Sequence, residues 1–163
     1  MKEIFRFSGM GLILFAALTF YREYKKHLEY REGLCEGFFK LLGHIRRQID
    51  CYLTPASELL SGFCDELLER CGFLSLAREV GVKDAYFSME RELRLSSSAK
   101  EILHSLLNDF GKDYKDGTVK EIDRALASLE KTLLREREEN EKEKKITGVV
   151  CAAAAVGIII LII

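Results

Sequence analysis

The chain ends with KEKKITGVVCAAAAVGIIILII, residues 142–163, in which a charged run passes directly into eighteen residues that carry no charge. At the 1.5 Å rise per residue of an α-helix, this apolar stretch spans roughly 27 Å, close to the thickness of the hydrocarbon core of a bilayer. A buried helix of a globular domain usually keeps a polar stripe, whereas the polar side chains here are only Thr147 and Cys151. The sequence therefore predicts a C-terminal transmembrane helix over residues 146–163.

A second apolar stretch, FSGMGLILFAALTFY, occupies residues 7–21 and also carries no charge. It has the outline of a cleavable signal peptide as well as that of a membrane span. Retention is favoured, because Ala16 and Ala17 are followed by bulky and then basic residues rather than by a small, polar cleavage site. We therefore expect an N-terminal transmembrane helix within residues 1–21, with cleavage as the alternative, and a separate domain over residues 22–145.

The basic residues indicate the orientation of this domain, since lysine and arginine accumulate on the cytoplasmic side of membrane spans. Four basic residues follow the first apolar stretch: Arg22, Lys25, Lys26 and Arg31. Five precede the second: Arg135, Arg137, Lys142, Lys144 and Lys145. Only Lys2 and Arg6 stand before the first stretch. The five cysteines are Cys35, Cys51, Cys64, Cys71 and Cys151. Their odd number without paired spacing also favours a reducing compartment, so residues 22–145 are expected in the cytoplasm.

Helices are expected throughout the middle of the chain, which has one proline, Pro55, and no alternation of apolar and polar residues long enough for a strand. Apolar residues at helical spacing predict a helix over residues 34–49 and a second one from Thr54 to Gly72. Two short helices divided by Gly81 are expected within residues 73–95. Two further helices are expected, one over residues 98–111 and one from Thr118 onward. Thr54 is a suitable N-cap before Pro55, and Ser98 with Glu101 and Thr118 with Glu121 have the spacing of capping boxes. The predicted fold is all-α, an antiparallel bundle of about five or six helices between two transmembrane helices.

The run REREENEKEKK, residues 135–145, joins the last predicted bundle helix to the C-terminal span and has five residues of each charge sign. This balance is typical of a solvated helix with internal ion pairs. If helical, the run would be a spacer of roughly 16 Å. A frayed linker is the alternative, because such pairs stabilise a helix by only about 0.2–0.5 kcal/mol each.

The sequence contains no recognisable catalytic, cofactor-binding or metal-binding motif. The glycine clusters lack the Lys-Ser/Thr ending of a phosphate-binding loop. His27, His44 and His104 are far apart, and none stands beside another ligand at metal-binding spacing. We therefore expect no enzyme, no cofactor, no small-molecule substrate and no nucleic-acid partner.

Four short motifs occur in a fixed order: the basic stretch YREGL at residues 30–34, Thr54 with Pro55, the loop FGKDYKDGT at residues 110–118, and Asn140 followed by Gly148 at the start of the last span. In this order they resemble the stage III sporulation protein AB family of endospore-forming bacteria. The chain departs from the family at Arg46 and Gln48, where members carry acidic residues, and a glutamine expected after the loop is missing.

The resemblance implies a role, because the soluble domain of that family is similar to the cytoplasmic helical domain of platform protein F of type II secretion. It implies a non-enzymatic scaffold beside a secretion-type ATPase, at a channel between mother cell and forespore. The expected location is the mother-cell membrane around the forespore, with the domain in the cytoplasm. A membrane-anchored adaptor unrelated to sporulation is the alternative, and a membrane enzyme that uses the bundle interior is a weaker one.

Two groups of residues are candidates for contacts with other molecules. Arg46 and Arg47 are adjacent on a helix whose other face is apolar, and arginine suits protein interfaces. Gly148, Ala152 and Ala155 place small residues near one side of the C-terminal span, where a second helix could approach closely. A solvated helix face and an inert anchor are the respective alternatives.

Overall fold

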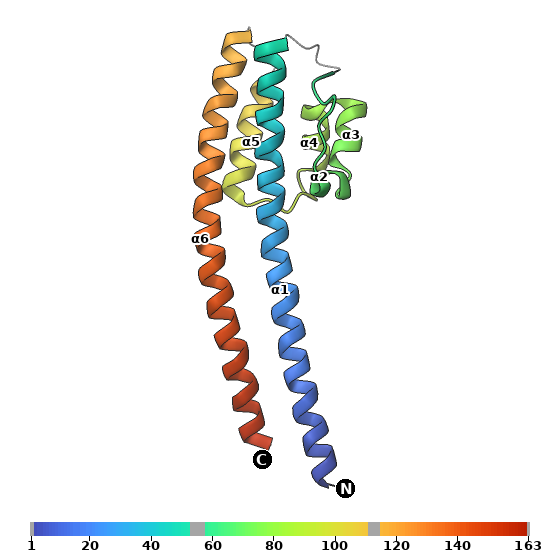
Figure 1. Ribbon diagram of the computed structural model, residues 1–163, viewed down its shortest axis with the longest axis vertical. Helices are drawn as coiled ribbons and strands as arrows, with labels where there is room; N and C mark the ends of the chain where they lie inside the picture. Colours follow the sequence, from blue (N-terminus) through green and yellow to red (C-terminus); the bar gives the residue numbers. More distant parts are fainter. Residues whose placement is uncertain (1, 53–57, 111–114, 163) are drawn as a thin grey trace. The chain divides into compact units, whose positions relative to one another are not determined.

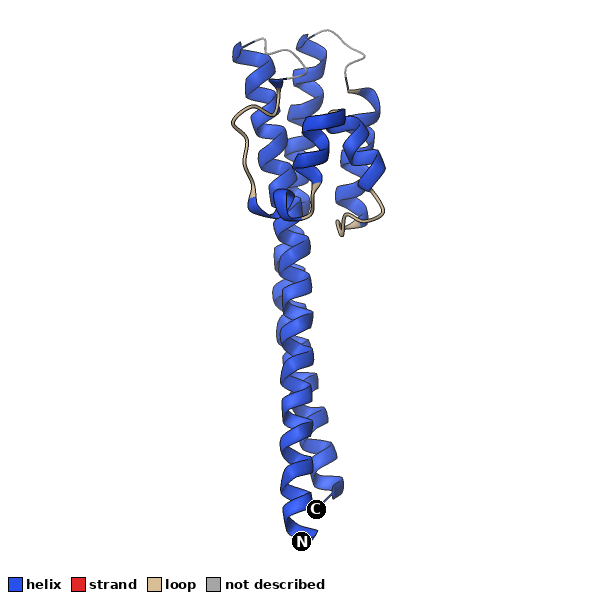
Figure 2. Ribbon diagram, turned by 90° about the vertical axis from the view of Figure 1, so that its right-hand side faces the viewer, coloured by secondary structure: helices blue, strands red, loops and turns tan. Residues whose placement is uncertain are grey.

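The structure of the chain is a computed structural model that describes residues 2–52, 58–110 and 115–162 (Figure 1). Within these ranges, the side chains of residues 2–8, 10, 51, 52, 115, 116, 159, 161 and 162 lie outside the description. The described residues form six α-helices and one π-helical turn and contain no strand (Figure 2). The predicted all-α class is confirmed.

The chain divides into two compact units, each built from segments that lie close together in space. The first, which we call the terminal helix pair, consists of Met1–Glu29 and Arg137–Ile163. The second, which we call the helical bundle, is Tyr30–Glu136. Residues 22–29 and 137–145, which the sequence grouped with the bundle, therefore belong to the first unit.

Two long helices contribute to both units. Helix α1 covers Lys2–Arg47 and continues into a π-helical turn, Gln48–Tyr52, while α6 covers Lys115–Ile162. The predicted N-terminal span is thus the first part of a single helix rather than a separate one. The charged run 135–145 is helical, as expected, and the frayed alternative is wrong.

Helix α1 is at the centre of the bundle core. Its residues Leu34, Phe38, Leu41 and Ile45 are all at most 1% exposed. The Phe38 ring packs edge-on against Phe73, with 4.8 Å between ring centroids. Figure 1 shows α5 and α6 beside this part of α1, with the short helices α2, α3 and α4 grouped together next to it. The core therefore forms on more than one face of α1, since the adjacent residues Leu34 and Cys35 are both buried, as are Leu41 and Leu42.

The predicted helix from Thr54 to Gly72 is wrong in its described part. Residues 58–65 form turns and irregular backbone, and α2 covers only Glu66–Arg70. Gly62 has a φ of +73°, which a helix does not allow, and the Asp65 carboxylate accepts hydrogen bonds from the first-turn amides of α2. The helix therefore starts at this cap. Thr54 and Pro55 lie outside the described residues.

The next helices agree more closely with the sequence. Helices α3, Phe73–Val80, and α4, Val82–Met89, are divided at Gly81, whose φ is +92°, and this confirms the two short helices. Helix α5 covers Ser97–Asp109 and is capped by Ser96, which accepts a hydrogen bond from the Ala99 amide. The predicted cap at Ser98 is therefore two residues late, because the earlier serine already has the extended backbone of a cap.

The predicted cap at Thr118 is also wrong. Helix α6 already includes Lys115, so Thr118 lies inside the helix, where it is 7% exposed. Residues 111–114, in the predicted loop before it, lie outside the described residues.

The terminal helix pair is antiparallel. The Tyr24 hydroxyl donates to Glu143 Oε2 at 2.9 Å, and Lys144 Nζ is 3.7 Å from Glu29 Oε1. The less exposed residues follow each other at intervals of three or four, as expected for helices packed along a seam: Gly9, Ile13, Ala17, Tyr21, Tyr24 and Leu28 on α1, and Asn140, Lys144, Gly148, Cys151 and Ala155 on α6.

No helix is long and apolar enough to cross a membrane within the part of the chain that the structure describes. The predicted spans, residues 1–21 and 146–163, include the side chains of residues 1–8, 10, 159 and 161–163, which lie outside that part.

Two glycines of α1 offer a matched test of the packing between α1 and α2. A Cβ added at Gly37 would lie 3.1 Å from Asp65 Oδ1 and from Leu68 Cγ, whereas one at Gly43 would meet nothing within 4 Å. We expect Gly43→Ala to raise the free energy of unfolding by about 1 kcal/mol, because alanine is the better helix former. Gly37→Ala should lose this gain, since it displaces the cap of α2. Thermal unfolding followed by circular dichroism measures both, and equal stabilisation would contradict the close approach.

Candidate functional site: a groove between α5 and α6

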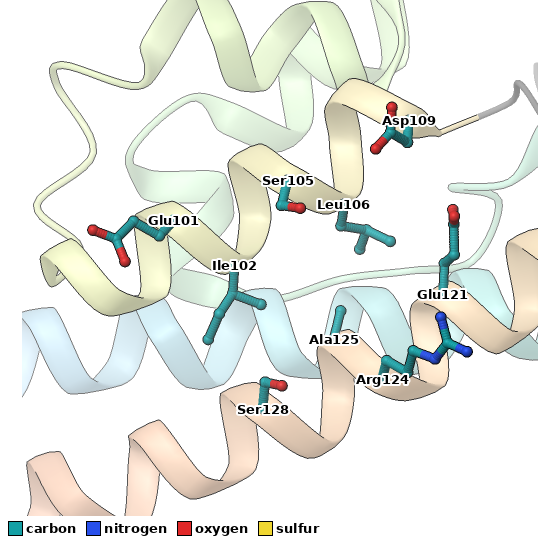
Figure 3. A pocket seen from close by; sticks show the side chains of 9 residues that line it. All are labelled: Glu101, Ile102, Ser105, Leu106, Asp109, Glu121, Arg124, Ala125 and Ser128. Atoms are coloured by element: carbon teal, nitrogen blue, oxygen red, sulfur yellow. The ribbon is translucent and has the colours of Figure 1, made fainter.

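The bundle has a groove of about 420 Å³ between α5 and the first half of its α6 segment (Figure 3). Ile102, Leu106 and Ala125 provide its apolar surface, and the last two are buried. Ser105 and Ser128 add small, exposed side chains, so the two helices leave space between them. The groove is a candidate binding surface because it combines this apolar floor with a charged border.

The border of the groove is mainly acidic. Glu101 and Asp109 come from α5, Glu121 comes from α6, and Arg124 is the one basic residue among the described residues that line it. Figure 3 shows Glu121 and Arg124 one turn apart on α6, with Asp109 across the groove. No other described residue forms an ion pair with Glu101, Glu121 or Arg124. The charges of Glu101, Glu121 and Arg124 are therefore available to a ligand.

A second depression adjoins this groove along α5. Glu90, Lys100 and His104 line it together with Glu101 and Ser105, and its volume is about 440 Å³. His104 Nδ1 lies 3.4 Å from Glu90 Oε1, and its ring packs edge-on against Phe87. The His104 ring thus already contacts Glu90 and Phe87 within the bundle.

A third depression, of about 650 Å³, lies between the turn before α2 and the junction of α3 with α4. Arg78 connects the walls, donating to the Phe63 carbonyl at 3.1 Å and to Glu69 Oε1 at 2.7 Å. Cys64, an exposed thiol, lies at its edge. The guanidinium stabilises an irregular loop here and is not free for a ligand.

The structure places the two predicted contact arginines differently. Arg46 Nε lies 2.6 Å from Asp123 Oδ1 and Nη2 lies 3.3 Å from Oδ2, a two-pronged pair that joins the end of α1 to α6. Arg46 Nη1 is also 3.6 Å from Asp50. The neighbouring Arg47 is exposed. Arg46 therefore stabilises the packing of α1 on α6, and Arg47 is the more accessible of the two.

The predicted small-residue positions of the last span also differ from one another. A Cβ added at Gly148 would lie 3.5 Å from the Tyr21 ring, and Ala155 is 4% exposed, so both lie at the seam of the terminal helix pair. Ala152 is exposed. The helix that approaches Gly148 is thus the N-terminal part of the same chain.

One buried acidic residue is missed by the interpretation of the sequence. Glu136 belongs to the charged run expected to be solvated, yet it is 6% exposed, and its Oε1 has no hydrogen-bond partner among the described residues. Leu129, Leu133, Glu136 and Asn140 follow each other at intervals of four, three and four residues and are all buried. This heptad-like spacing is the signal available in the sequence, hidden because two of its positions are polar.

Glu136 acts electrostatically on a buried thiol. Burial, and then the charges of Glu136 and Glu32, raise the pKa of Cys35 from 9.0 to about 12. Cys35 is completely buried and stays protonated at neutral pH. Cys35, Cys64, Cys71 and Cys151 are free thiols, and the Cys51 side chain lies outside the described residues. The described residues contain no group of three or more His, Cys, Asp or Glu side chains placed to hold a metal ion.

Comparison with known proteins identifies a family. The model of a protein family described as stage III sporulation protein AB matches residues 6–163. No curated protein and no solved structure matches the chain.

The raised pKa of Cys35 predicts a loss of stability in base. Above about pH 9 the thiol of the unfolded chain loses its proton while the folded chain retains it, so unfolding becomes easier as the pH rises. Tyr86 adds to this trend, because burial raises the pKa of its phenol as well. We expect the melting temperature to fall by a few degrees between about pH 8 and pH 10.5. Cys35→Ala should flatten this slope, whereas Cys64→Ala, at an exposed thiol, should leave it unchanged. Equal slopes in all three proteins would contradict the assignment.

Proposed function

The chain belongs to the stage III sporulation protein AB family and is therefore related to sporulation, and we propose that it is a non-enzymatic, membrane-anchored platform that docks a secretion-type ATPase. In this proposal the terminal helix pair is inserted in the mother-cell membrane around the forespore, and the bundle is in the cytoplasm. The platform would form part of a channel complex between the two cells.

The observation that carries the membrane part is the alignment of the two apolar stretches in the terminal helix pair. Tyr21 ends the first stretch and lies against Gly148, near the start of the second. The first charged residues on the inner side, Arg22 and Lys145, directly border the two stretches. In an antiparallel pair both helices thus change from charged to apolar at the same level, as expected for a hairpin of two spans at a membrane surface.

The outward-facing residues of this pair support the same proposal. Many of them are large and apolar, and those with more than half of their surface exposed include Leu12, Leu14, Phe15, Leu18, Phe20, Val149, Val150, Val156 and Ile160. A water-soluble helix pair carries polar residues on this side. Lipid is the solvent that suits such a surface, and the basic residues at its inner end favour a cytoplasmic bundle.

A second candidate function, a membrane-anchored adaptor that binds its partner through a coiled coil of the charged run, has less support. The inner face of this run is already used within the chain, since Glu136 and Asn140 are buried and Lys144 reaches Glu29. A coiled coil with a partner would need a second apolar seam, and residues 135–145 contain no apolar residue.

The membrane part can be tested with two substitutions in the terminal helix pair. Leu14 and Val156 are 52% and 53% exposed, and both face away from the seam. An arginine in the middle of a span costs about 2.5–3.5 kcal/mol, so Leu14→Arg with Val156→Arg should move the full chain out of the alkali-resistant membrane fraction. Leu14→Val with Val156→Leu is the control and should stay in that fraction. A wild-type chain found in the supernatant would overturn the anchor itself.

The docking part rests on the exposed arginine at the end of α1. Arg47→Glu should weaken co-purification of the full chain with the secretion-type ATPase of the same cell and leave the melting temperature unchanged, because Arg47 is exposed. Arg46→Glu should lower the melting temperature, since it breaks the pair with Asp123. Full retention of the ATPase by Arg47→Glu would exclude this contact. Nucleotide hydrolysis by the purified chain alone would overturn the non-enzymatic role.

A further inference from the structure

We infer that the groove between α5 and α6 is a docking surface for a basic amphipathic helix of a partner protein. This inference rests on the proposed platform function for its biological setting. The groove does not include Arg47, so it would be a second contact surface of the bundle. Its support comes from the shape of the groove, its small residues and its charge.

The shape of the groove favours a macromolecule over a small molecule. Small-molecule sites are concave pockets that enclose most of their ligand. The groove instead lies along two neighbouring helices, and Figure 3 shows its lining side chains spread along both of them. A surface of this kind accepts a third helix, whose ridge of side chains fits between the first two.

Small side chains set how closely that helix could approach. Ser105, Ala125 and Ser128 line the groove, and none of them extends beyond its γ atom. A bulky residue of the incoming helix, such as leucine, could therefore reach the apolar floor made by Ile102 and Leu106. This arrangement places one apolar anchor of the partner at the centre of the contact, as in helix-in-groove recognition.

The charge of the border selects a basic partner. Three carboxylates, on Glu101, Asp109 and Glu121, line the groove with one guanidinium, on Arg124. They would repel nucleic-acid phosphates and anionic lipid headgroups, so a protein is favoured. Glu101 on α5 and Glu121 on α6 lie toward opposite ends of the groove (Figure 3), and neither forms an ion pair with another described residue. Two lysines or arginines of the partner helix, on either side of the apolar anchor, would match these two carboxylates.

A second copy of this chain is the competing occupant. The large apolar residues exposed in the described part of the bundle are Val80 and Leu134. Leu134 has basic neighbours in Lys131 and Arg135, but Arg135 already donates to Ser98 Oγ at 3.0 Å within its own bundle. The contact with another protein is therefore favoured, and self-association is an outcome of the test.

The test uses the full chain in detergent and a labelled, designed helical peptide. The peptide carries two lysines two turns apart on either side of a central leucine, and a second peptide carries glutamates in place of the lysines. We expect saturable binding of the basic peptide by fluorescence anisotropy, weakened by salt, and no binding of the acidic one. Because each exposed ion pair contributes a few-fold to affinity and reversal adds repulsion, Glu101→Lys with Glu121→Lys should weaken binding about tenfold.

Two matched controls make the result specific to the groove. Glu92→Lys with Glu130→Lys changes the net charge equally at exposed positions that do not line the groove, and it should bind like the wild type. Ser128→Trp should fill the groove and abolish binding, whereas Ala127→Trp, at the exposed neighbouring position, should not.

Three results would overturn the inference: equal binding of the two peptides, equal loss in the matched charge variants, or a dimer in sedimentation that Ser128→Trp dissociates. None of these depends on membrane insertion or on the ATPase. Failure of the groove and failure of the proposed function are therefore distinguishable.

Discussion

The bundle depends on the central position of one helical segment, Tyr30–Arg47 of α1. This segment contacts several other helices: Gly37 lies against Leu68 of α2, Phe38 packs on Phe73 of α3, and Arg46 pairs with Asp123 of α6. A helix that is packed on several faces must be apolar around most of its circumference and small where a neighbour comes closest. A substitution at a buried position of this segment therefore disturbs the packing of several helices at once, whereas a substitution at the exposed Arg47 does not.

The polar residues buried along α6 show a second constraint. Glu136 and Asn140 continue the spacing of Leu129 and Leu133, so the buried face of α6 does not end where the apolar residues end. Buried polar groups reduce stability when they are incompletely paired, and in helix pairs they can favour one register over others. In the described part of the bundle, the buried Oε1 of Glu136 has no hydrogen-bond partner and therefore reduces the stability of the fold. The same carboxylate helps to keep Cys35 protonated, which makes a reactive role for that thiol unsuitable.

In the proposed function, the two units of the chain contact different solvents. The terminal helix pair has an outer surface suited to lipid, while the bundle has a charged surface with an acidic groove. A platform needs both properties, an anchor and a surface that a partner can recognise. The acidic groove and the exposed Arg47 carry opposite charges, so they would select partner surfaces of different chemistry. This difference lets their contributions be measured separately.

The sequence by itself determined the all-α class, the two short helices on either side of Gly81 and the family, because helical spacing, a glycine stop and short motifs in order are local properties. It did not determine the loop at residues 58–65, where the cap at Asp65 prevailed over helical spacing. Only the tertiary structure decided that Arg46 is paired, that Glu136 is buried and that α5 and α6 border a groove. Each of these depends on which side of a helix meets another helix far away in the chain, and local spacing does not contain that information.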